Sequence, residues 1–426
     1  MTERDASPVR QFVSLERDVL VLSAAMFAFS LGFQMTGRYL PKYLAVLGAG
    51  AGVVGLYGSL GNLISAVYPY PGGVLSDRIG SSRALTLFGA LSALGFLAWY
   101  AAPAAGDLAI LVVFCGLLLA QCWKSFGLGA TFALVKASVE PDRLARGFAS
   151  TEVFRRVGFL AGPLLAAAVL AWTTDFLAGF RVVLLVGAVV AVAATVAQYV
   201  LYDASDEPVG KSIESLRDVV DDLRALPSEL RPLLVADTLV RWGNGMAYVF
   251  VVLVVTDYLD VGFAAVGVTL SPESFFGVLL AVEMAVALAS MLPVSRLADG
   301  LGLKPVVALG FAVYGVFPVL LVFAPANQWV LVALFAFSGL RFAGLPAHKA
   351  LIVGPAARGA GGRTTGAYYL VRNVVTVPAP VVGGVLYAGD PRLAFAAASA
   401  VALAGVAYFI YYGERFDAAA ASAGSP

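Results

Sequence analysis

Long apolar segments recur along the whole chain, each separated from the next by a few polar or charged residues. The segments are about 20 residues or longer, the length an α-helix needs to cross the hydrocarbon core of a bilayer. The pattern predicts twelve membrane-spanning helices, which places both termini on one side. The predicted spans are Asp18–Leu40, Ala51–Ser76, Arg83–Ala102, Asp107–Lys136, Ala149–Trp172, Ala178–Tyr202, Leu233–Tyr258, Pro272–Pro293, Leu303–Phe323, Gln328–Leu351, Thr364–Ala388 and Arg392–Tyr412.

The composition supports a membrane protein. The 426 residues are 60% hydrophobic and 13% charged, and the mean hydropathy is +0.87. A soluble domain with this balance has too little polar surface, and a net charge of +1 gives no support for a nucleic-acid partner. Cys115 and Cys122 lie about 10 Å apart along a helix, too far for a disulfide, and the single histidine, His348, completes no metal site with them. We expect no cofactor.

The basic residues predict the orientation. Eighteen Lys and Arg residues fall on the side of the termini, whereas the opposite side has only Arg38, Lys42, Arg181 and Arg392. Because cytoplasmic loops carry the excess of basic residues, we expect both termini to be cytoplasmic and the protein to lie in the plasma membrane.

A polar stretch with three prolines divides the chain into two halves. The predicted organisation is a cytoplasmic tail (1–17), a six-helix bundle (18–202), a cytoplasmic linker (203–232), a second six-helix bundle (233–412) and a cytoplasmic tail (413–426). Apolar residues recur at helical spacing inside the linker. They predict a short amphipathic helix that tethers the halves or contacts lipid.

The second half repeats features of the first. Lys124 and Arg341, Arg155 and Arg372, and Pro163 and Pro380 each differ by 217 residues, and Gly32 and Met35 match Gly243 and Met246 at a slightly different offset. Charged residues and prolines seldom align in this way by chance. The repeat therefore favours two similar bundles over one irregular bundle.

Two polar segments link this chain to a known family. The sequence Gly73–Arg83 (GVLSDRIGSSR) resembles the G-x-L-x-D-R-x-G signature that follows the second span of major facilitator superfamily transporters, and Ser295–Lys304 is a weaker echo after the eighth span. The resemblance covers nearly the whole chain. It implies an all-α fold of two pseudo-symmetric six-helix bundles that rock about a site near the midplane, a small-molecule substrate and a monomer.

The fifth span contains Gly158–Ala167 (GFLAGPLLAA), which is similar to the G-x-x-x-G-P-x-x-G-G pattern of proton-coupled antiporters in that family. Ala166 and Ala167 replace its last two glycines. Small residues also serve ordinary helix packing in membranes, so this segment favours export only in part.

Charges at membrane depth face a partner or an aqueous cavity, and they mark the candidate site. Lys124 and Arg341 lie near the middle of the fourth and tenth spans, which line the central cavity in the resembled family. Two cations in one cleft favour an anionic substrate, with Arg suited to bidentate recognition. Alternatively, an acid neutralises each of them. Other candidate substrate contacts are Gln34, Gln121, Trp123 and Asn244.

Two acidic residues are candidates for proton coupling. Glu283 lies deep in the eighth span, where burial disfavours the charged carboxylate; a static ion pair with Arg341 or Arg241 is the alternative. Asp237 lies four residues before Arg241 on one helix face, which predicts a local pair, with a proton role as the alternative.

Several charged residues at the cytoplasmic ends of the spans are predicted to form a gate that stabilises one conformational state. They are Asp77, Arg78, Asp299, Glu152, Arg155, Arg156 and Arg372.

The predicted function is secondary active transport of a small organic solute, most simply an anion coupled to protons, by alternating access. No phosphate-binding G-x-x-x-x-G-K-[ST] loop occurs, so an ion gradient must supply the energy. Proton-driven export of hydrophobic or drug-like compounds is the alternative. An enzyme is not expected because no catalytic set occurs; a transporter-like sensor or lipid translocator would keep the same fold.

Overall fold

The protein was analysed as a computed structural model that describes residues 17–126, 144–201, 224, 226–265, 267–353 and 361–413. The described chain forms two compact units. Unit 1 draws on residues 1–40 and 67–213, and unit 2 on residues 41–66 and 214–426. Residues 41–66, which the predicted boundaries assign to the first bundle, therefore pack with unit 2. The two predicted tails, apart from Arg17 and Gly413, and most of the predicted linker lie outside the described residues.

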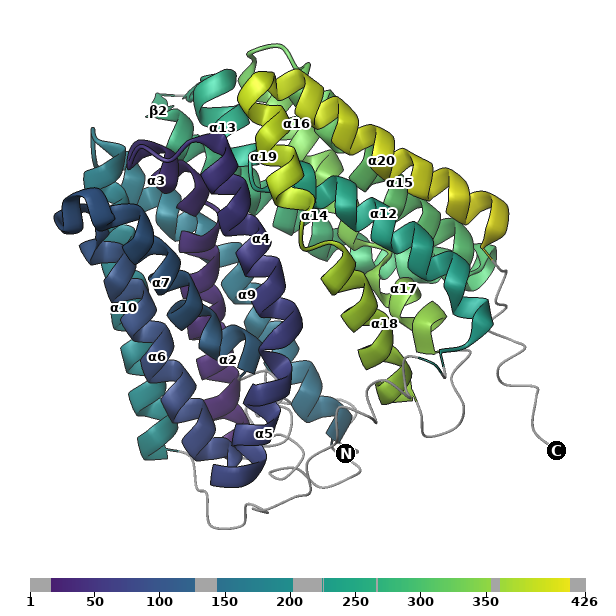
Figure 1. Ribbon diagram of the computed structural model, residues 1–426, viewed down its shortest axis with the longest axis horizontal. Coiled ribbons are helices and arrows are strands. Elements are labelled where there is room, and N and C mark those ends of the chain that lie inside the picture. Colours follow the sequence, from purple (N-terminus) through teal and green to yellow (C-terminus); the bar gives the residue numbers. More distant parts are fainter. Residues whose placement is uncertain are drawn as a thin grey trace. The chain divides into compact units, whose positions relative to one another are not determined.

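Unit 1 consists of helices that run alongside one another (Figure 1). α2 packs on α9 and α10, and α10 also packs on α6. The elements are α2 (Arg17–Gly37), α5 (Pro69–Ile79), α6 (Ser81–Ala101), the 3₁₀ helix η2 (Ala102–Leu108), α7 (Ala109–Gln121), the π-helix η3 (Cys122–Phe126), α9 (Leu144–Ala171) and α10 (Phe176–Leu201).

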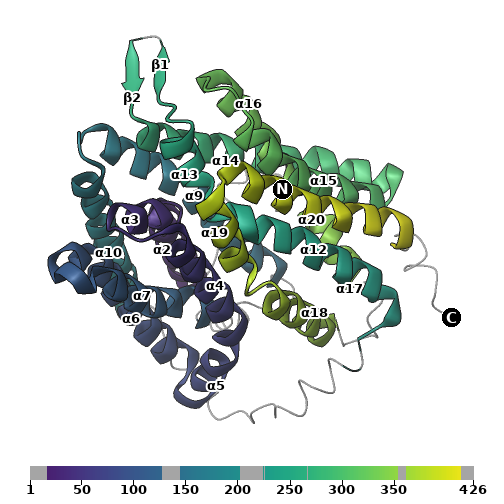
Figure 2. The same cartoon turned by 45° about the horizontal axis from the view of Figure 1, so that its top comes forward.

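Unit 2 is also helical, with one short hairpin that Figure 2 shows as a pair of antiparallel arrows. Its strands pair with Phe263 opposite Leu270. The elements are α3 (Leu40–Val46), α4 (Ala51–Val67), η4 (Ser228–Leu230), α12 (Arg231–Tyr248), α13 (Val251–Leu253), the π-helix η5 (Val254–Tyr258), β1 (Phe263–Ala265), β2 (Val268–Leu270), α14 (Pro272–Leu301), α15 (Leu303–Val322), α16 (Gln328–Gly339), the 3₁₀ helix η6 (Leu340–Phe342), α17 (Leu345–Val353), α18 (Gly361–Val375), α19 (Ala379–Gly389) and α20 (Pro391–Tyr412).

Glycines at the matched positions of the repeat allow close helix packing in both units. A Cβ on Gly243 of α12 would lie 2.3 Å from the backbone oxygen of Ala398 in α20. Its counterpart Gly32 in α2 faces Gly187 of α10, and a Cβ on Gly32 would lie 3.8 Å from the Gly187 carbonyl oxygen. The first and last spans of each half are therefore neighbours in both units, as a duplicated bundle requires.

The number of spans depends on how broken helices are counted. Within the described ranges, nine helical stretches are long and apolar enough to cross a bilayer, or ten if the bent pair Ser228–Tyr248 and Val251–Tyr258 is one span. One of the nine, Ser81–Ser125, is not a single straight helix. Its two parts, α6 and α7, pack against each other, and Trp99 Nε1 of α6 donates a 2.9 Å hydrogen bond to the Val113 carbonyl of α7. These helices establish the predicted class of all-α membrane protein, whereas the count of twelve stays a prediction.

The two polar segments around Asp77 and Asp299 lie largely within helices, although the predicted spans end at Ser76 and Pro293. α5 continues to Ile79 and α14 to Leu301, and each is separated from the next helix by a single glycine with positive φ. These glycines, Gly80 (φ 90°) and Gly302 (φ 84°), reverse the chain without further loop residues because glycine tolerates the left-handed region. Both aspartates thus lie in the last turn or so of a helix and not before the first turn of the next; their side chains are outside the described part.

Candidate functional site

A buried ion pair occupies the middle of unit 2. Arg341 lies in η6, between α16 and α17, and pairs with Glu283 of α14; the two residues are 5% and 3% exposed. Ser338 donates a 2.8 Å hydrogen bond to the same Glu283 oxygen, Oε1. Burial of both charges at this depth requires their pairing, because an isolated ion in an apolar interior is strongly destabilised. The acid that we predicted as a proton carrier is therefore the partner of a predicted substrate cation.

Aromatic rings surround the guanidinium of Arg341. Its Cζ atom lies 4.8 Å from the ring centre of Phe342 and 5.1 Å from that of Tyr314. Phe317 and Tyr248 complete the enclosure at 5.8 and 5.7 Å. Arg341 Nε is buried, and no acceptor among the described residues binds it. The guanidinium thus keeps one donor unused while its charge is held by Glu283 and the rings.

Asp237 of α12 is a second buried centre, with no exposed surface. Arg241 Nε lies 3.3 Å from its Oδ1, which confirms the local pair that the spacing of four residues predicts. Arg372 Nη1 from α18 lies 3.1 Å from Oδ2, and the Tyr368 hydroxyl donates to Oδ2 at 3.2 Å. His348 Nε2 from α17 lies 3.4 Å from Oδ2. One carboxylate therefore joins three helices.

A small cavity lies between these two centres. Arg241, Arg341 and His348 line it together with Tyr314 and Phe311 of α15. Arg241 Nη1 donates a 3.0 Å hydrogen bond to the Tyr314 hydroxyl, and the same ring lies under Arg341. Tyr314 thus links the Asp237 centre to the Glu283 centre. Asn244, another predicted contact, lies half-buried on α12 one turn beyond Arg241.

The candidate residues of unit 1 gather where the fourth predicted span changes its winding. Trp123 and Lys124 lie in the π-helix η3, directly after Gln121 at the end of α7. Trp123 stacks on Phe29 of α2 with ring centres 4.1 Å apart. Its Nε1 and Gln121 Oε1 are buried without a hydrogen-bond partner in the part of the chain that is described. Single π turns are often found at functional sites, where they redirect side chains.

Lys124 differs from Arg341 in its surroundings. Its side chain is exposed, and no described carboxylate forms an ion pair with it. The charged groups whose fields reach it are the cations Arg38 and Arg155. Of these two, Arg155 is itself paired with Glu152 of α9. Gln34, in the last turn of α2, is half-buried where α2 packs against Gly162 of α9.

The predicted gate residues with described ion pairs form them inside their own units. In α9, Glu152 binds Arg155 through two hydrogen bonds of 2.9 and 2.7 Å and also binds Arg156. Arg372 instead binds Asp237 in unit 2. Arg155 and Arg372, which match in the repeat, therefore pair with different acids, Glu152 and Asp237. Arg78 is exposed, and the side chains of Asp77 and Asp299 lie outside the described residues.

Three features of unit 2 were missed by the sequence analysis. His348 was considered only as a metal ligand, and Tyr314 drew no attention. Lys42 of α3 contacts Asp257 at the end of η5 and lies 3.6 Å from Glu273 at the start of α14. The rarity of histidine in the chain was a signal for the first; the other two depend on contacts between distant segments. The described residues include no group of three or more His, Cys, Asp or Glu side chains arranged for a metal.

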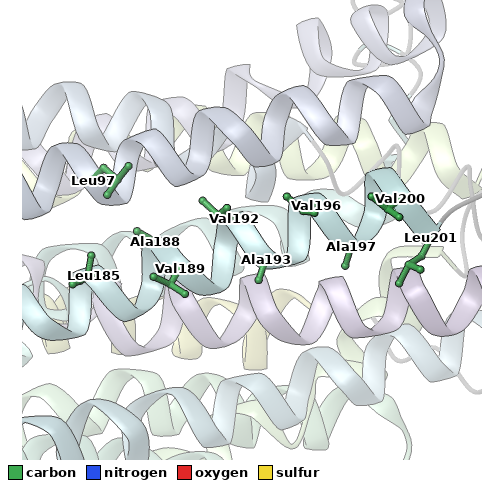
Figure 3. Close-up of a pocket in the computed structure, with 10 residues that line it drawn as sticks. All are labelled: Leu97, Leu185, Ala188, Val189, Val192, Ala193, Val196, Ala197, Val200 and Leu201. Carbon is green, nitrogen blue, oxygen red and sulfur yellow. The ribbon is translucent and has the colours of Figure 1, made fainter.

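A second hollow is purely apolar. Leu97 of α6 and nine residues of α10 between Leu185 and Leu201 line a groove of about 1100 Å³ on the surface of unit 1 (Figure 3). Its lining offers leucine, valine and alanine side chains, which suit lipid chains better than a polar solute. The substrate candidates lie elsewhere in the unit.

The comparisons with known proteins agree with this architecture. The family model of the Major Facilitator Superfamily matches residues 22–272 and 233–425. An uncharacterized MFS-type transporter, MJ1317 from Methanocaldococcus jannaschii, is 23% identical over 400 residues, which cover 91% of this chain and 93% of that protein.

Solved structures share the fold at low sequence identity. A bacterial homologue of the iron transporter ferroportin, in an inward-facing state, has a TM-score of 0.73 at 17% identity and covers 96% of this chain and 100% of its own. The nucleoside transporter NupG has a TM-score of 0.69 at 14% identity and covers 94% and 99%. With the family model matching both halves, this multi-pass membrane protein belongs to the major facilitator superfamily of transporters.

Proposed function

We propose that this chain is a secondary active transporter that moves a small organic anion by alternating access, coupled to protons. We further propose the plasma membrane as its site, with both termini on the cytoplasmic side. The observation that carries the substrate class is the exposed Lys124, whose described charged neighbours are cations. A cation at membrane depth needs an anion, and a substrate carboxylate or phosphate can provide it.

The equivalence of Lys124 and Arg341 supports this proposal. The two residues are 217 positions apart, and each lies at an interruption of α-helical winding, η3 for Lys124 and η6 for Arg341. Interrupted helices at binding sites expose backbone groups and side chains that a regular helix conceals. We propose that Lys124 provides the net positive charge for the anion, because Glu283 already compensates Arg341 within unit 2.

The neighbouring groups suit an organic substrate. Trp123 offers an indole N–H, and Gln121 an amide oxygen, that described residues leave without partners. We propose that the anionic group lies near Lys124 while these groups bind the remainder. The fold alone does not choose the substrate, because the similar structures include transporters of nucleosides and a homologue of an iron transporter.

The test is uptake into proteoliposomes under an imposed pH gradient, with a panel of organic anions and lipophilic cations. Lys124→Ala is compared with Lys349→Ala, which removes the same charge from an exposed position on α17. We expect gradient-driven anion uptake that falls at least tenfold in Lys124→Ala and is unchanged in Lys349→Ala. Uptake of lipophilic cations that is indifferent to Lys124 would contradict the proposal and support the alternative, a proton-driven exporter of hydrophobic compounds.

A further inference from the structure

His348 is buried with an unused hydrogen-bonding atom. It is the single histidine of the chain, lies on α17 and is 4% exposed. Its Nε2 atom is 3.4 Å from Asp237 Oδ2 but forms no hydrogen bond with it or with any other described residue. Its ring also lines the small cavity shared with Arg241 and Arg341. A buried polar atom left in this way calls for an explanation.

The donors around Asp237 compete for one oxygen. Arg241 uses Oδ1, whereas Arg372, Tyr368 and His348 all approach Oδ2, at 3.1, 3.2 and 3.4 Å. The first two form hydrogen bonds with Oδ2, and the imidazole does not. A carboxylate oxygen has two lone pairs, so a third close donor can bind only by displacing one of the others.

Resting on the proposed function, we propose that His348 binds the coupling proton and that protonation exchanges the donors on Asp237 Oδ2. An imidazole gains and loses a proton near neutral pH, unlike a carboxylate held by two guanidiniums. Asp237 is held in this way by Arg241 and Arg372, and Glu283 is held by Arg341. The two acids predicted from the sequence are thereby held as counter-ions of arginines, whereas the imidazole is held by no hydrogen bond of Nε2 among the described residues.

The charged and titratable groups around His348 come from every helix packed on α17. They are Asp237 and Arg241 of α12, Glu283 of α14, Tyr314 of α15, Arg341 of η6, and Tyr368, Tyr369 and Arg372 of α18. With a neutral imidazole, these groups carry three positive and two negative charges. Protonation adds a fourth positive charge to this cluster.

The exchange would loosen the attachment of α18 to α12. A charged N–H on His348 forms a bond of about 2.7–2.9 Å with a carboxylate, so Nε2 would close on Oδ2 and displace Arg372 or Tyr368. The other contacts of Arg372 are with Asn373 and the ring of Tyr369, both on α18 itself. Once displaced, Arg372 has no described contact that returns it to α12. Protonation would therefore be transmitted to helix packing.

The first arm of the test needs no substrate. The full chain, purified without a histidine tag and labelled with ¹⁵N-histidine, is placed in lipid nanodiscs, and its single imidazole is followed by NMR from pH 5 to pH 9. We expect a titration in the wild type whose midpoint falls by at least one pH unit in Asp237→Asn, because the carboxylate favours the protonated ring. A wild-type signal that does not change across this range would overturn the proposal.

The second arm uses transport of the anion identified in the uptake screen. His348→Gln should retain exchange of labelled for unlabelled anion without a gradient but lose at least tenfold of the accumulation driven by pH. Ser290→Ala, which removes a hydroxyl bonded only within α14, should change neither. Accumulation by His348→Gln at the wild-type level would overturn the proton site while leaving the transporter intact. Absence of anion flux in the wild type would reject the proposed function alone, since the NMR titration decides the proton site.

Discussion

The buried pair of Arg341 and Glu283 gives a quantitative prediction about stability. Both residues are at least 95% buried, and Ser338 is the other polar group bound to the carboxylate. Removing one member leaves an uncompensated buried charge, which costs about 3–5 kcal/mol in such pairs. We therefore expect Arg341→Met and Glu283→Gln each to lower the free energy of unfolding by about that amount. The equilibrium constant then changes by roughly two to three and a half powers of ten.

The double variant separates pairing from burial. If the cost arises from the unpaired partner, Arg341→Met with Glu283→Gln should cost no more than either single variant, giving an interaction energy of about 3–5 kcal/mol. The measurement is reversible unfolding by sodium dodecyl sulfate from mixed micelles, followed by circular dichroism for the wild type, both single variants and the double variant.

Glu152→Gln is the matched control, because Glu152 pairs with Arg155 and Arg156 and the three side chains are 35%, 30% and 26% exposed. A pair of this exposure contributes about 0.2–1 kcal/mol. Single variants of Arg341 and Glu283 that cost no more than this control would refute the reasoning. A double variant whose cost equals the sum of the singles would show that the two charges act independently.

Three further predictions concern packing, the unit 1 site and the contact across unit 2. Gly243→Ala should destabilise the protein by about 1–3 kcal/mol in the same assay, since its Cβ has no room, whereas Gly61→Ala, in open space on α4, should be neutral or slightly stabilising. Trp123→Phe should keep the stacking on Phe29 and the stability, but raise the KM for the anion at least fivefold if the indole N–H binds substrate; an unchanged KM would exclude that contact. Lys42→Gln should remove the cation that Asp257 and Glu273 share and speed hydrogen–deuterium exchange of the β1–β2 hairpin, and unaltered exchange would show that Lys42 does not hold this region.

The sequence was informative wherever a feature depends on residues close in the chain. Apolar segments of about 20 residues predict the membrane helices, and the spacing of Asp237 and Arg241 predicts their pair. The constant offset between Lys124 and Arg341 also identified positions that share an interruption of helical winding. That interruption itself was not predicted, because one π or 3₁₀ turn leaves no mark in hydrophobic periodicity.

Contacts between distant segments could not be predicted in this way. Arg372 reaches Asp237 across 135 positions, a contact that its predicted place in the cytoplasmic gate did not indicate. The packing of residues 41–66 with unit 2 is of the same kind. Helical periodicity states which side of a span is apolar, but it does not state which polar group a buried charge will meet.

The differences between the two halves suggest how function is divided. At the offset of 211 residues that relates Gly32 to Gly243, Asp237 corresponds to Met26, which is buried and apolar. The predicted second span, which corresponds to the span holding Glu283, is formed by α4 and α5. α4 contains no carboxylate. Arg341 is therefore compensated by a buried acid of unit 2. Its counterpart Lys124 has no ion-pair partner among the described residues of unit 1.

This asymmetry leads to separable effects of substitution. If unit 1 supplies the net positive charge for the anion, variants at Lys124 or Trp123 should change KM at every pH by a similar factor. If the His348 and Asp237 contact governs coupling, variants there should shift the pH profile of accumulation while leaving the KM for exchange close to the wild-type value. An initial-rate series from pH 5 to pH 8 for both sets compares the two effects directly. A Lys124 variant that shifts the pH profile, together with a His348 variant that changes only KM, would show the reverse: that unit 1 governs coupling and unit 2 binds the anion.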